Sequence, residues 1–518
     1  MSQPDRVAAP PRAKPELLDR LREDLQSYTL ANVEAALGDV AAAALLREQP
    51  VPALRALSGR QEPCATLFRL FVLGQVPTRR EVATALPRLG VDGAASCGLV
   101  VSAGHGPDDG VRAVVDLVPY SAQDSAGDVD WWLASDVSEL ASGRPLAAEH
   151  VLGVGGASRT LAQLTVRDPV SRVLDLGTGC GIQALHCARH AQEVVATDIS
   201  GRALAFARLN AALAGVRVEL RRGSLLEPVA GEEFDLVVSN PPFVITPRGA
   251  GSALASHTYR DGGRAGDDLL RDLVLGLGGV LAPGGVAQLL GNWEHHLRGG
   301  WQERVRGWLD AGGLDGWLIQ REVADPAEYA ETWLRDGGLT PEREPAAWRA
   351  GYEAWLGDFA ARGVTGVGFG YLTLRRPRSG RPTLRRVEEL PGPVAGPLGE
   401  HLAACLRAHD WLDTTDDRAL ASARLVVAAD VTEERHYRPG DADPQVVLIR
   451  QGSGFGRVIR VGTALAGLVG ACDGELNVGQ IVAALAALLQ APADGLAGEV
   501  LPGVRDLVRD GLLVPEPD

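Results

Sequence analysis

The sequence predicts an α/β fold built on a doubly wound, mostly parallel sheet, with small winged-helix-like modules at its N- and C-terminal sides. Three observations indicate this class. Apolar runs of strand length alternate with segments of helical periodicity between residues 172 and 375. A glycine-rich turn at 177–181 follows the first apolar run, and the acid Asp198 ends the second. Such alternation produces parallel strands joined by helices that cover both faces of the sheet.

The alternating segment contains seven expected strands. They are expected at 172–176, 193–198, 216–221, 234–239, 286–292, 316–323 and 364–375, with helices at 180–190, 201–214, 265–281 and 300–311. A helical insertion at 325–361 separates the last two strands, and its Trp333, Trp348 and Trp355 are interpreted as core residues, with substrate contact as the alternative. A glycine-rich stretch at 153–156 is interpreted either as a plain connection or as a close approach to a ligand.

The 518 residues are enough for about three domains. We expect a disordered leader at 1–15, a helical and winged-helix-like module with a strand pair (111–119 and 130–134) at 16–145, the α/β core at 146–376, a linker at 377–398 and a C-terminal winged-helix-like module at 399–518. Capping patterns start two helices, one at Thr78 with Glu81 and one at Asn477. The arginine run from Arg375 to Arg386 is interpreted as a solvated tether, with a phosphate-contacting patch as the alternative.

Charge and cysteine usage exclude several classes of protein. The net charge of -15 argues against indiscriminate nucleic-acid binding, although a local basic groove is compatible with it. The six cysteines form no Cys-x-x-Cys pair and no cluster with histidine, so we expect reduced thiols, a cytoplasmic protein and no metal site. No apolar run approaches about 18 residues and the leader lacks a signal-peptide core, so no membrane contact is expected. These features leave the oligomeric state open.

Candidate cofactor-binding residues follow four expected strands at their carboxyl ends, where open α/β sheets bind ligands. Asp198 lies about 20 residues beyond the glycines, where an acid binds ribose hydroxyls. Asp175 would repel a phosphate and suits a ligand with an ammonium and a sulfonium, which predicts S-adenosylmethionine as the cofactor. The full candidate set is Asp175, Gly177, Thr178, Gly179, Gly181, Asp198, Ile199, Ser224, Leu225 and Asn240.

Asn240, Pro241, Pro242 and Phe243 are the candidate catalytic residues. The Asn240 side-chain oxygen and the Pro241 carbonyl can both accept from one NH2 group. They would fix its nitrogen and stabilise the positive charge that grows there during methyl transfer. The proline pair stiffens the loop, and the Phe243 ring can stack on a planar amide or base. This scheme needs no dedicated general base.

These motifs resemble those of class I S-adenosylmethionine-dependent methyltransferases, over 171–292 and more loosely over 150–375, in the branch with an Asn-Pro-Pro-Phe/Tyr motif. The resemblance implies a seven-stranded methyltransferase sheet and methylation of a planar nitrogen: a release-factor glutamine, the N6 of adenine, or the N2 of guanine in ribosomal RNA. The protein-glutamine enzymes usually have Tyr at the position of Phe243. The guanine enzymes typically have His at the position of Val244, and many members have Asp at that of Ser224.

The sequence therefore predicts an N-methyltransferase that acts on a planar amide or amino nitrogen of a macromolecule, either a protein glutamine or an rRNA base. Two alternatives stay open. One is methylation of a small molecule. The other is a non-catalytic S-adenosylmethionine-binding regulator that works through its winged-helix modules, against which the intact 240–243 motif argues.

Overall fold

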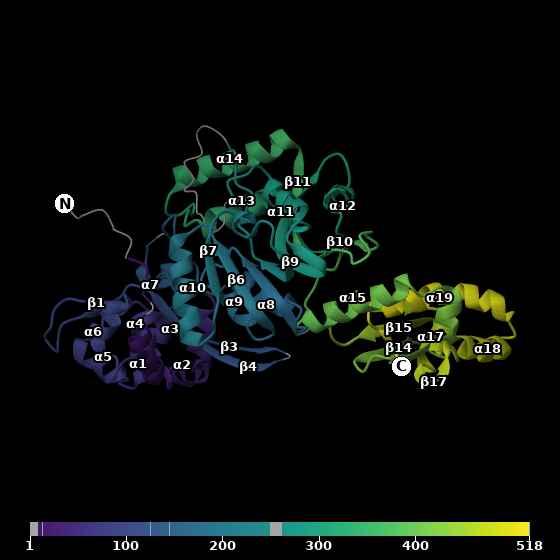
Figure 1. Cartoon of the computed structure of the whole chain (residues 1–518), viewed down its shortest axis with the longest axis horizontal. Coiled ribbons are helices and arrows are strands. Elements are labelled where there is room, and N and C mark those ends of the chain that lie inside the picture. The colour runs from purple at the N-terminus through teal and green to yellow at the C-terminus, as the bar shows by residue number, and fades with distance from the viewer. Residues whose placement is uncertain are drawn as a thin grey trace. The chain divides into compact units, whose positions relative to one another are not determined.

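The computed structural model describes residues 9–12, 14–124, 126–144, 146–248, 262–394 and 396–516. The chain divides into two compact units, the first formed by 1–162 and 169–389 and the second by 163–168 and 390–518. The first unit runs from purple to green in Figure 1, and the second from green to yellow. Most of the leader expected at 1–15 lies outside the described residues, and helix α1 (Pro15–Leu25) begins where that leader was expected to end.

An eight-stranded sheet organises the first unit, in the order β12-β10-β11-β9-β8-β5-β6-β7. Strands β5 to β9 pair in parallel, β12 pairs in parallel with β10, and β11 runs antiparallel to both its neighbours. The mostly parallel α/β sheet is confirmed, but the count of seven strands is wrong. The strands are β5 (Val170–Leu176), β6 (Ala191–Asp198), β7 (Glu219–Arg222), β8 (Phe234–Ser239), β9 (Leu281–His296), β10 (Asp315–Ala324), β11 (Val364–Arg375) and β12 (Arg385–Glu389).

The additional strand, β12, lies within the segment that was expected to be a linker. Its ladder with β10 places it at the edge of the sheet. Carboxylates and an indole of the core bind Arg375 at the end of β11 and two arginines of β12 itself, so the solvated-tether interpretation is wrong for these residues. The contacts are Arg375 with Asp315 (2.9 Å), Arg385 with Asp310 (2.7 Å), and Arg386 over the Trp317 ring (4.6 Å to its centre).

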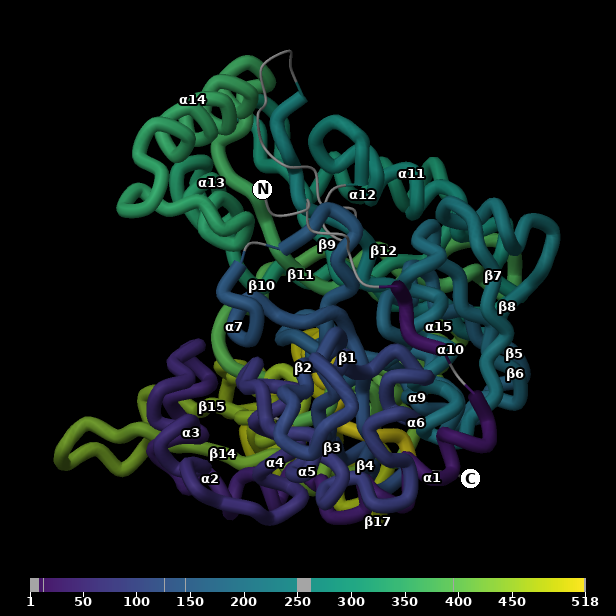
Figure 2. Tube along the Cα trace, turned by 90° about the vertical axis from the view of Figure 1, so that its left-hand side faces the viewer, coloured from purple at the N-terminus to yellow at the C-terminus, as the bar shows by residue number. Residues whose placement is uncertain are grey.

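Four helices that alternate with the strands of the sheet divide between two hydrophobic cores. Helices α9 (Ile182–Cys187) and α10 (Gly201–Ala214) share one with the N-terminal module, whereas α11 (Asp268–Leu277) and α12 (Trp301–Gly312) share the other with strands of the sheet. The segment expected as a helical insertion contains a pair of helices, α13 (Pro326–Asp336) and α14 (Pro345–Arg362). These two helices lie next to each other in Figures 1 and 2 and pack against β11.

The N-terminal module packs against the core through a buried amide. The Asn210 side chain, on α10, donates to the carbonyls of Ala134 (2.9 Å) and Cys180 (2.8 Å) and accepts from the Ala134 N–H (2.8 Å).

The capping box predicted at Thr78 in the N-terminal module is confirmed, and the strand expected at 111–119 is split between β2 and β3. The elements are α2 (Leu30–Leu45), α3 (Val51–Ala56), α4 (Pro63–Phe71), α5 (Arg79–Ala85), α6 (Gly90–Ser96), the pair β1 (Val100–Ser102) and β2 (Val111–Ala113), the pair β3 (Asp116–Asp124) and β4 (Gly127–Ser135), α7 (Glu139–Ser142), and α8 (Gly156–Leu164), which leads into β5.

The second unit contains two small sheets with the strand orders β17-β13-β18 and β14-β15-β16. The helix cap predicted at Asn477 is confirmed, as a capping box with Gln480. The winged-helix assignment of both flanking modules remains a prediction. Within the described ranges, no helix is long and apolar enough to span a bilayer. The elements are α15 (Gly399–Asp413), α16 (Asp417–Ser422), β13 (Arg424–Val427), β14 (Val431–His436), β15 (Val446–Gln451), β16 (Val458–Val461), α17 (Thr463–Gly470), β17 (Asp473–Asn477), α18 (Val478–Leu489), α19 (Ala493–Arg509) and β18 (Leu513–Pro515).

Candidate active site at the carboxyl ends of the parallel strands

A pocket of about 700 Å³ opens at the carboxyl ends of β5, β6, β7 and β8. The four sequence motifs that follow these strands meet there, as the position of ligand sites in open α/β sheets predicts. Gly181 is the one predicted site residue that does not line this pocket. The predicted residues in the wall are Asp175, Gly177, Thr178, Gly179, Asp198, Ile199, Ser224, Leu225, Asn240, Pro241, Pro242 and Phe243.

The glycine turn after β5 needs backbone conformations that other residues adopt only with strain. Gly177, Gly179 and Gly181 have φ of 73°, 54° and 91°. No described atom lies within 4 Å of where a Cβ would stand on Gly177 or Gly179, whereas one on Gly181 would lie 3.1 Å from Ala207 of α10. Gly181 therefore permits close packing between the turn and α10. Gly177 and Gly179 leave space in the pocket that a side chain would otherwise fill.

Asp175 organises the glycine turn from inside the protein. Its side chain is 1% exposed, and one carboxylate oxygen accepts from the Thr178 hydroxyl (2.6 Å) and from the Ala184 N–H (2.9 Å). Burial raises the pKa of Asp175 to about 7. The sequence predicted Asp175 as a partner of the cofactor's ammonium group. The structure shows this carboxyl group fixing the glycine turn and the first turn of α9, and its contact with the cofactor stays a prediction.

Asp198 ties the end of β6 to the glycine turn. One oxygen accepts from the Gly179 N–H (3.0 Å) and the other from the Ser200 N–H (2.8 Å). Burial raises the pKa of this carboxyl group above its ordinary value. Ile199, next in the chain, is 55% exposed at the pocket. Beyond β7, Leu225 has a φ of 47°, so the turn that carries Ser224 is held in a conformation unusual for leucine.

Asn240 brings an unsatisfied acceptor to the pocket. It follows Ser239, whose hydroxyl donates to the Leu176 carbonyl (2.8 Å) and so joins the ends of β8 and β5. The Asn240 Oδ1 atom is buried and has no hydrogen-bond partner among the described residues. Leaving a buried acceptor unpaired costs roughly 1–3 kcal/mol, and such atoms in native proteins call for a functional explanation. An NH2 group that entered the pocket would satisfy it.

The loop after Asn240 is held by the helical insertion. The Ile245 N–H donates to the Tyr329 hydroxyl (3.0 Å), which also accepts from the Asn292 amide (2.9 Å). Burial raises the pKa of Tyr329 well above its ordinary value. The Phe243 and Trp333 rings lie edge to face, 6.4 Å apart at 72°. The motif's aromatic residue is therefore packed against a tryptophan of α13.

Several residues of the pocket wall were not predicted from the sequence. Trp333 was interpreted as core, and its helical periodicity carries no signal that distinguishes it from the buried Trp355. Gly153, Gly155 and Gly156 of the glycine-rich stretch line the pocket, and Gln183 donates to the Ser158 carbonyl of the following helix α8 (2.7 Å). Both interpretations of this stretch, a plain connection and a close approach to a ligand, remain predictions. Unpredicted wall residues include Glu149, His150, Gln183, Gly262, Gly263, Arg264, Leu269, Trp333 and Asp336.

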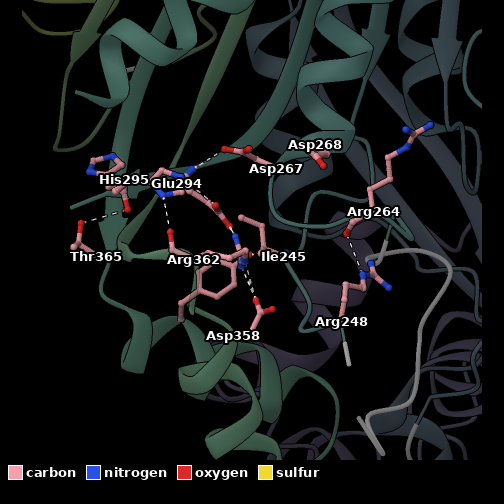
Figure 3. A network of polar contacts seen from close by, with 12 residues as sticks. Ile245, Arg248, Arg264, Asp267, Asp268, Glu294, His295, Asp358, Arg362 and Thr365 are labelled. Carbon is pink, nitrogen blue, oxygen red and sulfur yellow. Dashed lines mark hydrogen bonds and ion pairs between the residues drawn. The ribbon is translucent and has the colours of Figure 1, made fainter. Parts of the chain in front are cut away.

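A buried ionic network fixes the base of the insertion (Figure 3). Glu294 of β9, 2% exposed, pairs with Arg362 at the end of α14, and Arg362 also pairs with Asp358 (2.6 Å). The Asp267 carboxylate accepts from the Glu294 N–H (2.8 Å). Burial raises the pKa of Glu294 above its ordinary value. The network joins α14, β9 and the start of α11 next to the pocket.

The thiol of the glycine turn is shielded by burial. Cys180, in the glycine turn, is buried, and burial raises the pKa of its thiol to about 11. A thiol with that pKa stays protonated near neutral pH and is a weak nucleophile. In the part of the chain that the structure describes, no three His, Cys, Asp or Glu side chains gather to hold a metal ion.

Three family profiles match separate parts of the chain. Residues 153–256 match the methyltransferase small domain. Residues 26–114 and 403–515 match two domains of unknown function, DUF7059 and DUF7782. The sheet, the pocket at its strand ends and the first of these matches define an α/β methyltransferase.

The chain is also similar to curated glutamine methyltransferases. It is 37% identical over 224 residues to the release factor glutamine methyltransferase of Deinococcus radiodurans, which is 39% of this chain and 76% of that protein. It is 40% identical over 121 residues to the enzyme of the same name from Geobacter sulfurreducens, which is 22% of this chain and 42% of that protein. It is 34% identical over 159 residues to the ribosomal protein uL3 glutamine methyltransferase of Bordetella pertussis, which is 28% of this chain and 52% of that protein. The chain spans about half the length of these last two. It belongs to the class I S-adenosylmethionine-dependent methyltransferase family of which these glutamine methyltransferases are members.

Proposed function

We propose that this methyltransferase transfers a methyl group from S-adenosylmethionine to the side-chain amide nitrogen of a protein glutamine. The observation that carries the proposal is the buried Asn240 Oδ1 atom, which lines the pocket without a hydrogen-bond partner among the described residues. A primary amide offers an NH2 donor that fits this acceptor. The names of the relatives favour a protein glutamine over a base or a small molecule.

The residues present fit the cofactor. When bound, S-adenosylmethionine supplies an electrophilic methyl group on a positively charged sulfur. Gly177 and Gly179 leave open space at the turn, the Asp175 carboxyl group at the pocket wall suits the cofactor's ammonium group, and the Asp198 carboxylate suits two ribose hydroxyls. A cavity of about 700 Å³ is within the usual range for small-molecule sites. We infer that these residues hold the cofactor and that Ser224 lies near its adenine edge.

The residues at the end of β8 would act on the acceptor. The Asn240 Oδ1 atom and the Pro241 carbonyl accept from the amide NH2 and hold its nitrogen in line for attack. Both oxygens are partly negative, so they stabilise the positive charge that develops on that nitrogen. Phe243 packs on the flat face of the amide. An acceptor in the translation machinery would agree with the cytoplasmic location that the sequence predicts, and the winged-helix-like modules would flank this site.

The experiment is transfer of labelled methyl groups from S-adenosylmethionine into a fractionated lysate, with protein, RNA and small-molecule pools scored separately. We expect label in protein, recovered as methylated glutamine after hydrolysis by proteases. The Asn240→Ala variant should lose the label while it still binds the cofactor. Label confined to the RNA or small-molecule pool would overturn the proposed substrate, and an Asn240→Ala variant as active as the natural protein would overturn the role of the motif.

A further inference from the structure

The helical insertion places one of its tryptophans at the pocket wall, on the edge of its own core. Trp355 is 2% exposed within the cluster that α13, α14 and β11 form. Trp333 packs only at the edge of that cluster, is partly exposed, and lines the pocket beside Phe243. A large apolar ring at a pocket wall is available for contact with a ligand, and aromatic side chains bury much area at little entropic cost.

The insertion lies on the acceptor side of the pocket. In the strand order, β6 and β7 lie on one side of β5, whereas β8, β9 and β11 follow one another on the other side. The residues inferred to hold the cofactor's ribose and adenine, Asp198 and Ser224, follow β6 and β7. Helix α13 packs against β10 and β11, so Trp333 enters the wall from the side of Asn240 and not from the side of Asp198.

Trp333 is held in place from both ends of the insertion. At the start of α13, Asp325 caps the helix by accepting from the N–H groups of Ala327 (2.8 Å) and Glu328 (2.9 Å). At the end of α14, Arg362 binds the buried Glu294 of β9, as Figure 3 shows. One helical turn before Trp333, the buried Tyr329 hydroxyl binds the Ile245 N–H of the catalytic loop. The position of Trp333 relative to the 240–243 motif is therefore fixed by several contacts.

Phe243 and Trp333 together form an apolar corner. Their rings meet at 72° with centres 6.4 Å apart, so they present two flat walls that are nearly perpendicular. We propose that Trp333 selects the methyl acceptor: the corner holds the apolar stem and planar amide of an acceptor side chain beside Asn240. This inference rests on the proposed function, and it assigns to Trp333 a specificity role that the cofactor-binding motifs do not supply.

The chain offers a matched control in Trp348. It lies on α14 of the same insertion and is partly exposed like Trp333. It stacks on Tyr352 (6.0 Å, 14°) and under the Arg335 guanidinium (5.1 Å), and it does not line the pocket. Replacement of Trp348 removes an indole of the same size from the same helical insertion without changing the proposed corner.

The experiment compares Trp333→Ala, Trp333→Phe and Trp348→Ala with the natural protein. Calorimetry gives the Kd of S-adenosylmethionine, and release of S-adenosylhomocysteine gives kcat and KM for a glutamine-bearing acceptor protein from the labelled pool. We expect Trp333→Ala to raise the acceptor KM by roughly tenfold or more, as truncation of a buried aromatic anchor does. Trp333→Phe should recover most of the affinity, the cofactor Kd should change less than about twofold, and Trp348→Ala should match the natural protein in both constants.

Two results would overturn the inference. An acceptor KM that is unchanged in Trp333→Ala would show that the ring does not touch the acceptor. A parallel rise in the cofactor Kd would place Trp333 in the cofactor half of the pocket. Failure of the proposed function has a different signature, because the natural protein itself would then methylate no glutamine. Thermal unfolding of each variant shows whether it is folded. If Trp333→Ala is unfolded, Trp333→Phe, which retains an aromatic ring, is compared with the natural protein in its place.

Discussion

The Tyr329 hydroxyl oxygen accepts a hydrogen bond from the Ile245 N–H across 3.0 Å, and this contact joins the helical insertion to the loop that carries Asn240. Ile245 is five residues beyond Asn240. The same hydroxyl accepts from the Asn292 amide of β9. One buried oxygen thus sets the position of the motif against both the sheet and the insertion.

Tyr329→Phe should uncouple this loop from the insertion. The change leaves two buried donors without their acceptor, which costs roughly 1–3 kcal/mol of unfolding free energy. We expect urea denaturation to show that loss, and kcat to fall several-fold at an unchanged cofactor Kd. Tyr352→Phe is the control, because its exposed hydroxyl donates to Glu331 at the surface, where loss of a contact costs about 0.5 kcal/mol or less. Equal losses from the two variants would contradict the role given to Tyr329.

Asn240→Ala should separate catalysis from stability. The natural side chain keeps a buried oxygen without a partner among the described residues, so its removal also relieves a cost of desolvation. We expect kcat to fall by roughly 10²–10³-fold, as loss of one electrostatic contact to a developing charge does, while the unfolding free energy stays the same or rises. Single-turnover kinetics and urea denaturation measure the two quantities. A variant that lost both activity and stability would mean that Asn240 is chiefly structural.

Gly181→Ala should destabilise the turn by more than backbone strain alone. The added Cβ would meet Ala207 at 3.1 Å in a residue whose φ is 91°. Gly215, at the end of α10, has a φ of 72° and no described atom within 4 Å of a Cβ, so Gly215→Ala measures the strain of a positive φ, about 1–3 kcal/mol. We expect Gly181→Ala to lower Tm further than Gly215→Ala does. Equal shifts would show that α10 can move aside without cost.

The protonation of Asp175 should make stability depend on pH. Its pKa is raised by burial to about 7, so between about pH 4 and pH 7 the native protein holds a proton that the unfolded chain has lost. Stability from this group is therefore complete below about pH 4 and is lost as pH rises towards 7, at up to about 1.4 kcal/mol per pH unit. Asp175→Asn removes this dependence.

The measurement is urea denaturation of the natural protein and Asp175→Asn, without cofactor, at pH 5, 6, 7 and 8. The advantage of the natural protein over the variant should shrink from pH 5 to pH 7 and then level off. Subtracting the unfolding free energy of the variant from that of the natural protein at each pH removes the contribution of the other titrating groups. A difference that stays constant from pH 5 to pH 8 would mean that the carboxyl group is ionised throughout this range.

The core of the fold could be predicted because its signals are local. The apolar runs at 234–239 and 364–375 became β8 and β11 with the same bounds. Strand β9 is longer than its apolar run because its ladder with β11 continues to His296. Strand β12 was missed for a related reason: its residues are arginines and acids with a single Val387, and only their register against β10 makes them a strand.

Some residues of the site could likewise be assigned from local sequence motifs, whereas others depend on contacts that only the folded structure shows. Motifs that follow strand ends meet because parallel strands place their carboxyl ends at one edge, so Asp175, Asp198 and Asn240 could be assigned to one pocket in advance. Gly181 could not be told apart from Gly179 in the sequence, because only the approach of Ala207 gives it a different role. Trp333 was assigned to the core for the same reason: helical spacing does not say which tryptophan reaches a neighbouring pocket.

The amide of Asn210 makes the border at residue 146 a poor place to cut the chain. Three of its hydrogen bonds end on Ala134 and Cys180, two on a strand before the border and one on the glycine turn behind it. A fragment that begins at 146 would leave that amide facing solvent or an empty cleft, next to the loop that we infer binds the cofactor. The N-terminal module is thus part of the catalytic domain's own interior, and deletion of it would alter cofactor binding before it revealed anything about substrate recruitment.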